Sequence, residues 1–296
     1  MNDPLQISLI PLPAEQPTAA QRVIGKVADL ADTARHAKEQ TLIDKGLPAW
    51  PEKARGVPNG VLRSSLFRVA KKGNRDYLRR QKIASVDGLT VIFNGPRLCQ
   101  FHLDVWENCL HIARSRGTGQ IIRFTAYSFL KAIGRNTGKS DREWLKGVLL
   151  DLASSVVEIT DGKKTYFGQI LHHGIRDEVT KEYLIEINPR LALLYGADGW
   201  SRIEWEQRLA LKGQPLAQWL HGFYSSHAKP YPYKVETVKE LCGSDTRELF
   251  HFRAELRQAL MTLTSITGWL WKIDTGDLLH LFKRPRAGDS SQGVGG

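Results

Sequence analysis

The chain has 296 residues, which is long enough for one or two hydrophobic cores. Its 42 Lys and Arg residues against 31 Asp and Glu residues give a formal net charge of +11, which favours a polyanionic partner such as a nucleic acid. It contains neither an apolar run long enough to span a membrane nor a signal-peptide pattern at its start, so we expect a cytoplasmic protein. The three cysteines, Cys99, Cys109 and Cys242, lack zinc-site spacing and are too few and odd in number for a disulfide framework, so we expect buried thiols.

Residues 1–60 are predicted to form a flexible N-terminal arm. Four prolines keep the segment from Pro4 to Pro17 extended, and an amphipathic pattern predicts a short helix over residues 21–38. Prolines and glycines over residues 48–60 then predict a linker. Near the start, the segment Gln6-Ile7-Ser8-Leu9-Ile10 places spaced apolar residues after a glutamine, which is typical of a docking peptide.

A first domain is predicted over residues 61–198, with a basic segment at its start. Lys and Arg predominate from Lys53 to Lys82, where Asp76 is the single acidic residue. A solvated surface would explain such a charge run, but the charge of the whole chain favours contact with phosphates. The pattern that follows predicts strands at 89–93 and 121–124, and helices at 104–114 and 126–133, the last capped by Thr125.

The rest of the first domain is predicted to be a helix followed by a β-hairpin. Ser140-Asp141-Arg142-Glu143 has the pattern of a capping box, and an apolar stripe follows it from Leu145 to Leu152. Strands at 156–159 and 166–170, joined by a turn at 161–164, predict a hairpin. Together these elements predict a winged helix, a helix-turn-helix followed by a hairpin wing.

Two motifs near this helix have features of an enzymatic or a metal site. The run from Gly134 to Ser140 resembles a phosphate-binding loop, but it has three residues between its glycines where that loop needs four, and a predicted helix precedes it. Lys139 and Ser140 therefore fit a DNA phosphate at the helix N-terminus better than a nucleotide. Adjacent His172 and His173 should point to opposite faces of a strand, so we expect neither a metal site nor a catalytic site.

A second domain is predicted over residues 199–284, before a disordered tail at 285–296. After helices at 205–211 and 215–224, a short helix at 235–241 ends at Cys242-Gly243, and the next helix is expected to begin at Asp245, with Glu248 completing a capping box. Its apolar stripe comprises Leu249, Phe252, Leu256, Leu260 and Leu263. A hairpin at 269–273 and 278–282 follows. The predicted fold is therefore α+β, with two tandem winged-helix domains.

The polar face of the helix that starts near Asp245 is the predicted base-reading surface. It carries Arg247, His251 and Gln258, with Arg257 beside them, and small Ala254 between them. In the major groove Arg pairs with guanine and Gln with adenine, although a solvated helix face would look the same in sequence. We assign DNA binding to residues of this face, of its flanks and of the first domain: Arg247, His251, Arg253, Arg257, Gln258, Ser244, Thr246, Lys234, Lys239, Lys139, Ser140, Arg142 and Lys146.

The stretch from Phe223 to Asp245 resembles the TrfA-type replication initiators of broad-host-range plasmids. The similarity is carried by Ser225-Ser226-His227 with Pro230-Tyr231-Pro232, and by the run from Leu241 to Asp245; weaker similarity extends from Arg63 through Lys283. The resemblance implies tandem winged helices that bind repeated origin sequences (iterons), opening of an AT-rich region as single strands, and recruitment of the host replicative helicase and sliding clamp. It also implies an inactive homodimer, and Lys163, Lys164, Lys272 and Lys283 on the wings.

The sequence departs from that family at the clamp-binding peptide. The family places Gln-Leu-Ser-Leu-Phe shortly before an Ala-Pro-Trp-Pro run, whereas here Gln40-Thr41-Leu42-Ile43-Asp44 precedes Pro48-Ala49-Trp50-Pro51. We therefore prefer Gln6, Ile7, Ser8, Leu9 and Ile10 as the clamp-binding segment, and Gln40–Asp44 stays open as the alternative.

The expected function is a non-enzymatic replication initiator that needs no cofactor, no metal and no membrane. Two alternatives remain open. One is a tandem winged-helix transcriptional repressor, and the other is a P-loop nucleotidase that uses Lys139.

Overall fold

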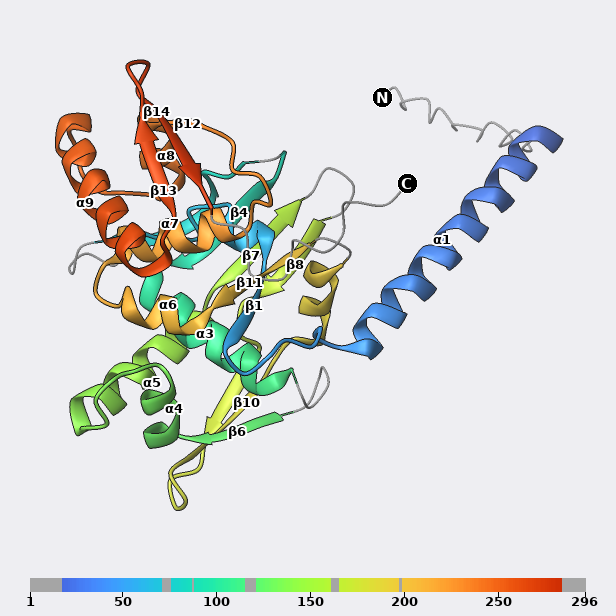
Figure 1. Cartoon of the computed structure of the whole chain (residues 1–296). Coiled ribbons are helices and arrows are strands. Elements are labelled where there is room, and N and C mark those ends of the chain that lie inside the picture. Colours follow the sequence, from blue (N-terminus) through green and yellow to red (C-terminus); the bar gives the residue numbers. More distant parts are fainter. Residues whose placement is uncertain are drawn as a thin grey trace, which may run out of the picture. The chain divides into compact units, whose positions relative to one another are not determined.

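The computed structural model describes residues 18–70, 76–86, 88–114, 121–160, 165–196 and 199–283 (Figure 1). The predicted clamp-binding residues Gln6–Ile10, wing lysines Lys163 and Lys164, and the predicted tail at 285–296 lie outside these ranges. The chain divides into two compact units, residues 1–41 and residues 42–296. Among the described residues, no helix combines the length and the apolar character that crossing a membrane requires.

Helix α1 (Ala19–Lys45) is longer than the predicted helix at 21–38. Its residues Ile24, Val27 and Leu30 are exposed. Helix α1 runs through Gln40–Asp44, the degenerate counterpart of the family's clamp-binding peptide. This segment is therefore helical in the structure.

The predicted linker over residues 48–60 is wrong, because Trp50 and residues 54–58 are buried. Strand β1 (Ala54–Pro58) is buried along its whole length and pairs antiparallel with β11 (Trp200–Glu204), and α2 (Asn59–Leu62) follows directly. Trp50 is 5% exposed and its indole N–H donates to His111 Nδ1 over 3.0 Å. Gly56 is needed here, since a Cβ at that position would lie 2.5 Å from the Trp50 ring. Gly56 therefore serves close packing against Trp50.

The first repeat contains three helices and a three-stranded sheet. Its elements are α3 (Gln100–Ala113), β6 (Ile121–Thr125), α4 (Ala126–Ala132), α5 (Lys139–Ala153), β9 (His173–Arg176) and β10 (Glu182–Glu186). The strands lie in the order β6-β10-β9. Thr125 caps α4 as predicted, because its side chain accepts a hydrogen bond from the Ser128 N–H over 3.2 Å.

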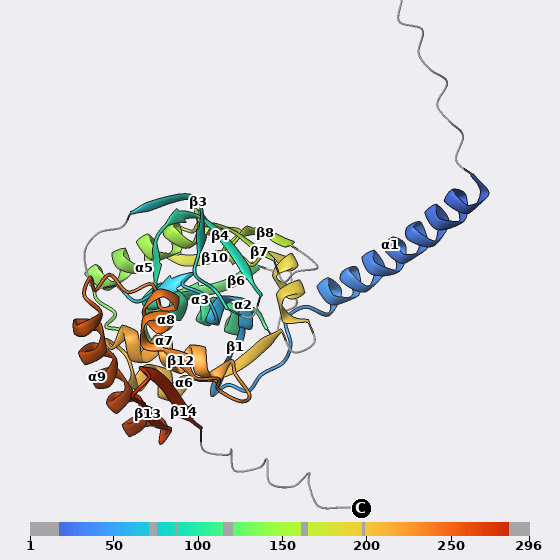
Figure 2. The ribbon, with the colours of Figure 1, turned by 90° about the horizontal axis from the view of Figure 1, so that it is seen from above.

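The second repeat has the same order of elements. It comprises α7 (Pro215–Ser225), β12 (Tyr233–Lys234), α8 (Val235–Leu241), α9 (Leu249–Thr267), β13 (Leu270–Ile273) and β14 (Leu278–Phe282), and α6 (Trp205–Ala210) precedes it. Its strands lie in the order β12-β14-β13, so the sheet has the same topology as β6-β10-β9. Figures 1 and 2 both show α9 beside the β13–β14 hairpin. The internal repeat expected from the sequence is therefore present in the order of helices and strands.

The hairpin predicted as the first wing belongs to a different sheet. Strands β7 (Val156–Thr160) and β8 (Thr165–Gln169) extend a four-stranded sheet of order β3-β4-β7-β8, with β3 (Tyr77–Ile83) and β4 (Thr90–Pro96). Comparison with the second repeat shows that β9–β10, with its turn at residues 177–181, occupies the place of β13–β14. The β7–β8 hairpin is an insertion between α5 and β9, and alternation of residues alone cannot say which sheet a hairpin will join.

The two repeats have separate hydrophobic cores that meet at an ion-pair network. One core draws its residues from Leu47 to Trp205 and the other from Leu211 to Leu281; short strands β2 (Phe67–Arg68) and β5 (Leu98–Cys99) and a 3-10 helix (Pro189–Tyr195) complete the first. At the boundary, the Arg208 guanidinium Nε lies 2.7 Å from Asp104 Oδ1 and 2.9 Å from Glu107 Oε2. Both acids come from α3 of the first repeat, and Arg208 Nη1 also donates to the Gln218 carbonyl of α7 over 3.4 Å, so the network joins the repeats.

Candidate nucleic-acid interface

The turn between α8 and α9 is fixed by one glycine. Gly243 has a φ of +60°, in the left-handed region that favours glycine, and a Cβ there would lie 2.9 Å from Arg68 Cβ. The Gly243 N–H donates to the Glu240 carbonyl over 3.0 Å, which closes the end of α8. Helix α8 occupies residues 235–241, as the sequence predicted. This turn therefore sets the direction in which α9 leaves.

The predicted capping box at Asp245 is wrong. Helix α9 begins at Leu249, and its N-cap residue is Glu248, three positions after the expected Asp245. The Asp245 carboxylate accepts a hydrogen bond from Arg68 and lies 3.8 Å from Arg97 Nη1. Two arginines from the first half of the chain thus take the carboxylate that the sequence assigned to the helix N-terminus. A competing partner so far away in sequence is invisible to a local motif.

Helix α9 buries one face and exposes the other, as predicted. Its buried residues are Phe252, Leu256, Ala259, Leu260 and Leu263. On the opposite side His251, Ala254, Arg257 and Gln258 are exposed, together with Phe250 and Met261. This exposed stripe, which we call the α9 face, presents a guanidinium, an imidazole and an amide around a small alanine. Such groups pair with base edges when a helix enters the major groove.

Residues before α9 belong to its turn. Arg247 is exposed, and its backbone carbonyl accepts a hydrogen bond from Lys239 Nζ over 2.9 Å. The Thr246 hydroxyl donates to Glu255 Oε2 over 2.8 Å, and Ser244 Oγ accepts from the Thr246 N–H over 3.2 Å. These contacts order the backbone that carries Arg247. Thr246, Ser244 and Lys239 therefore have structural partners that the sequence did not reveal.

Arg253 links α9 to the neighbouring hairpin. Its guanidinium donates two hydrogen bonds to the Asp277 carboxylate, over 3.0 and 2.8 Å, and this pairing raises the pKa of Arg253. Asp277 lies in the turn between β13 and β14, at a φ of +61°. In the same turn the Asp274 carboxylate lies 2.8 Å from His280 Nε2, which lowers the pKa of Asp274. Arg253 thus fixes the hairpin against the helix.

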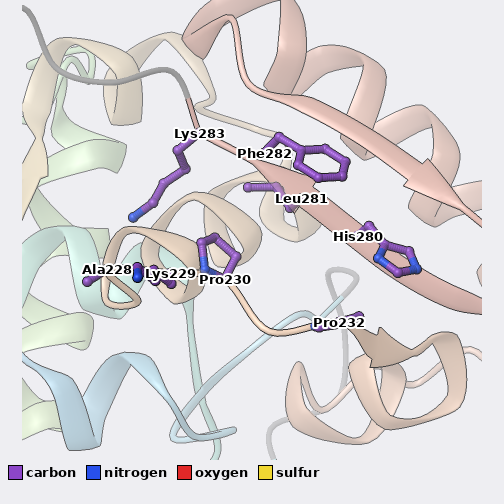
Figure 3. Close-up of a pocket in the computed structure, with 8 residues that line it drawn as sticks. All are labelled: Ala228, Lys229, Pro230, Pro232, His280, Leu281, Phe282 and Lys283. Carbon is purple, nitrogen blue, oxygen red and sulfur yellow. The ribbon is translucent and has the colours of Figure 1, made fainter.

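Lys283 also has partners within its own repeat. Its Nζ donates to the carbonyl oxygens of Tyr224, over 3.0 Å, and His227, and it lies 5.7 Å from the Trp269 ring centroid. Figure 3 shows its side chain beside a pocket between β14 and the segment from Ala228 to Pro232. Lys234 and Lys272, by contrast, are exposed.

The corresponding helix of the first repeat presents a different surface. Helix α5 begins at Lys139 with Gly138 as N-cap, so the predicted capping box at Ser140 is also wrong. Asp141 instead accepts hydrogen bonds from Arg135 over 3.1 and 2.9 Å, and Arg135 lies 3.7 Å from the Trp144 ring centroid. Lys139, Ser140, Arg142 and Lys146 are exposed on α5. As predicted, a helix (α4) rather than a strand precedes the loop that resembles a phosphate-binding loop.

The basic segment from Lys53 to Lys82 splits into two groups in the structure. Arg55 and Arg68 are buried, at 3% and 4% exposure, and have internal hydrogen-bond partners. Arg79, Arg80 and Lys82 on β3 are exposed, although Arg80 pairs with Glu158 over 3.1 Å. Part of the predicted phosphate-binding charge therefore serves the core.

Cys109 and Cys242 are buried, as expected, whereas Cys99 is only partly buried. Burial raises the pKa of Cys242 to about 12 and that of Cys109 further still, which keeps both thiols protonated near neutral pH. The expectation that His172 and His173 point to opposite faces of a strand is wrong, however. Both imidazoles contact the Glu186 carboxylate, because His172 lies just before β9 and is free of the alternation that a strand would impose.

Comparisons with known proteins identify the family. The family model described as TrfA protein matches residues 15–280. The plasmid replication initiator protein TrfA of Escherichia coli is 26% identical over 265 residues, which cover 86% of this chain and 68% of that protein. Domains 2 and 3 of RctB, in a crystal structure, share the fold at a TM-score of 0.50 and 10% identity, covering 76% of this chain and 98% of that one. Since the family model matches most of its length, the chain belongs to the TrfA protein family.

Proposed function

We propose that this protein is a plasmid replication initiator that binds iterons in its origin through two winged-helix domains. Membership of the TrfA family supports the initiator function, and the relative from Escherichia coli carries that description. Each repeat contains two helices joined by a turn and followed by a hairpin, the arrangement of a winged helix. We infer that α9 and α5 enter or approach DNA grooves, with β13–β14 and β9–β10 as the wings.

The observation that carries this proposal is the α9 face. A buried apolar stripe holds the helix to its core, while Arg257, Gln258 and His251 are exposed. Arg257 and Gln258 have the planar donor and acceptor groups that distinguish base pairs in the major groove, and Ala254 leaves room for close approach. Arg253 and Lys283 fix the hairpin and the domain through their own hydrogen bonds, and their direct contact with DNA stays a prediction.

The protein acts, in this proposal, without enzymatic activity of its own and within the bacterial cytoplasm. Binding of several copies to iterons opens an adjacent AT-rich region, and the bound initiator recruits the host replicative helicase. The segment Gln6–Ile10 binds the sliding clamp, and a homodimer is the inactive form. We expect Gln6→Ala with Leu9→Ala to abolish clamp capture in a pull-down; clamp capture that survives these changes would contradict this assignment.

Permanganate footprinting on an origin plasmid separates an initiator from a repressor. An initiator unstacks thymines in the AT-rich region, so we expect new reactive thymines when the protein is added. A transcriptional repressor would protect its site and leave the AT-rich region unreactive. ATP binding that is abolished by Lys139→Ala would instead favour the nucleotidase.

A further inference from the structure

His172, His173 and Glu186 lie together at one end of the β9–β10 hairpin. The register of the sheet pairs His173 with Glu186 across the two strands. His172 Nδ1 lies 3.2 Å from one carboxylate oxygen of Glu186, and His173 Nε2 lies 3.2 Å from the other. The three ligand atoms that these residues offer all lie within 4.8 Å of one another.

We propose that these three residues bind a zinc ion. Zinc takes imidazole nitrogens and carboxylate oxygens at roughly 2.0–2.2 Å in tetrahedral geometry, which separates neighbouring ligand atoms by roughly 3.3–3.6 Å. The separations from His172 Nδ1 to Glu186 Oε1 and from His173 Nε2 to Glu186 Oε2 are both 3.2 Å, which is close to that value. A pair of histidines with one carboxylate is a set of nitrogen and oxygen ligands that suits zinc better than magnesium or calcium.

The backbone holds two of these ligands in place before an ion arrives. His173 and Glu186 are fixed by the β9–β10 ladder, and Gly174 leaves room for the Ile185 side chain, since a Cβ there would lie 2.3 Å from Ile185 Cδ1. The side chains of His172 and His173 are 43% and 59% exposed, and that of Glu186 is 24% exposed. An ion can therefore enter from solvent, with a water completing its coordination.

Zinc would link the start of β9 to the end of β10, at the end of the hairpin opposite its turn. The turn at residues 177–181 lies at the opposite end of these strands, where Asp177 accepts backbone hydrogen bonds from Val179 and Thr180 over 2.7 and 2.8 Å. The site therefore has a structural role, stiffening the hairpin from its base. This inference does not depend on the proposed function, because it concerns metal binding by the free protein.

To test this proposal, the untagged full-length protein is treated with a chelator to remove metal and is then titrated with zinc, and binding is measured by calorimetry. We expect one bound zinc ion, and His172→Gln, His173→Gln and Glu186→Gln should each weaken binding by about tenfold or more. His36→Gln is the matched control, because His36 faces Glu39 at 3.8 Å as a single histidine-carboxylate pair. It should bind zinc like the original protein, and magnesium should not bind at this site.

Thermal unfolding separates metal binding from a folding defect. In chelator, all four variants should unfold close to the temperature of the original protein, because the changed side chains are largely at the surface. Added zinc should raise the unfolding temperature of the original protein and of His36→Gln, but not that of the three ligand variants. The proposal would be overturned if all variants bound zinc equally, or if the original protein bound no zinc. Glu186 would then simply accept hydrogen bonds from the two histidines.

Discussion

The two repeats share one order of helices and strands but differ in what their exposed helices present. The α9 face of the second repeat carries Arg257, Gln258 and His251, whereas α5 of the first carries Lys139, Lys146 and Arg142. Planar arginine and glutamine side chains suit base edges, while lysine is a point charge that suits phosphates. The first repeat also has the β7–β8 insertion before its hairpin. In the proposed function, the common scaffold thus presents base-reading groups in one copy and phosphate-binding groups in the other.

Disrupting the ion-pair network between the repeats should give the largest effect on stability. Arg208→Met removes the cation shared by Asp104 and Glu107, of which Glu107 is fully buried. Leaving a buried carboxylate without its cation costs about 3–5 kcal/mol, so we expect the free energy of unfolding in urea to fall by that amount. Arg190→Met, at an exposed arginine, is the control. Equal stability of both variants would mean that the network does not hold the repeats together.

Glu107 of the same ion-pair network should make the free energy of unfolding depend on pH. Burial raises the pKa of Glu107 to about 7, from an ordinary value of 4.5. The folded protein therefore binds a proton more readily than the unfolded chain between these values, and the resulting stabilisation is lost as pH rises through this window. We expect the original protein to lose on the order of 1–3 kcal/mol more than Glu107→Gln between pH 4.5 and 7.5.

Comparing the original protein with Glu107→Gln cancels the effect of His221 on the pH dependence of stability, which has the opposite sign to that of Glu107. Burial lowers the pKa of His221 to about 3, so its stabilisation is lost as pH falls below the ordinary value of 6.5. Both proteins contain His221, and its effect disappears from the difference. Parallel stability curves for the original protein and Glu107→Gln would show that Glu107 ionises normally.

Arg257→Ala should weaken specific DNA binding while leaving nonspecific binding nearly unchanged. Loss of a bidentate contact to a guanine costs about 1–3 kcal/mol of binding free energy on the cognate site. Affinity measured by fluorescence anisotropy on iteron and random duplexes gives both values. An equal loss on the two duplexes would assign Arg257 to phosphates and remove the contrast between α9 and α5.

Lys146→Ala in the first repeat should have the smallest effect. We expect the binding free energy to weaken by less than about 1 kcal/mol on every duplex, because binding to a phosphate carries no sequence information. The slope of log affinity against log salt should fall in magnitude by about 0.9, because the variant neutralises one phosphate fewer and releases fewer counterions. An unchanged slope would place Lys146 outside the interface.

Much of the secondary structure followed from the sequence, because local patterns determine it. The α9 stripe, the bounds of α8 and β14, and the Thr125 cap were confirmed. These features depend on residues a few positions apart, which a periodic pattern records. The exposure of the predicted base-reading residues followed for the same reason.

The errors arose where residues distant in sequence decide the structure. Asp245 pairs with Arg68 and Arg97 and does not cap α9. The β7–β8 hairpin pairs with β4 and so belongs to another sheet. Trp50 and β1 enter the core through β11, despite the prolines around them. Pairing between strands and between ions far apart in the chain is set by tertiary packing, which local propensity does not record. The convergence of His172 and Glu186 was missed for this reason too.

Selection of bound duplexes from a random pool tests most directly whether the α9 face reads bases. We predict that the full-length protein enriches direct repeats of one motif, and that His251→Ala with Arg257→Ala and Gln258→Ala loses the preference at base pairs within each repeat while still binding DNA. Enrichment of the same motif by both proteins would contradict the account, because specificity would then lie elsewhere on the chain.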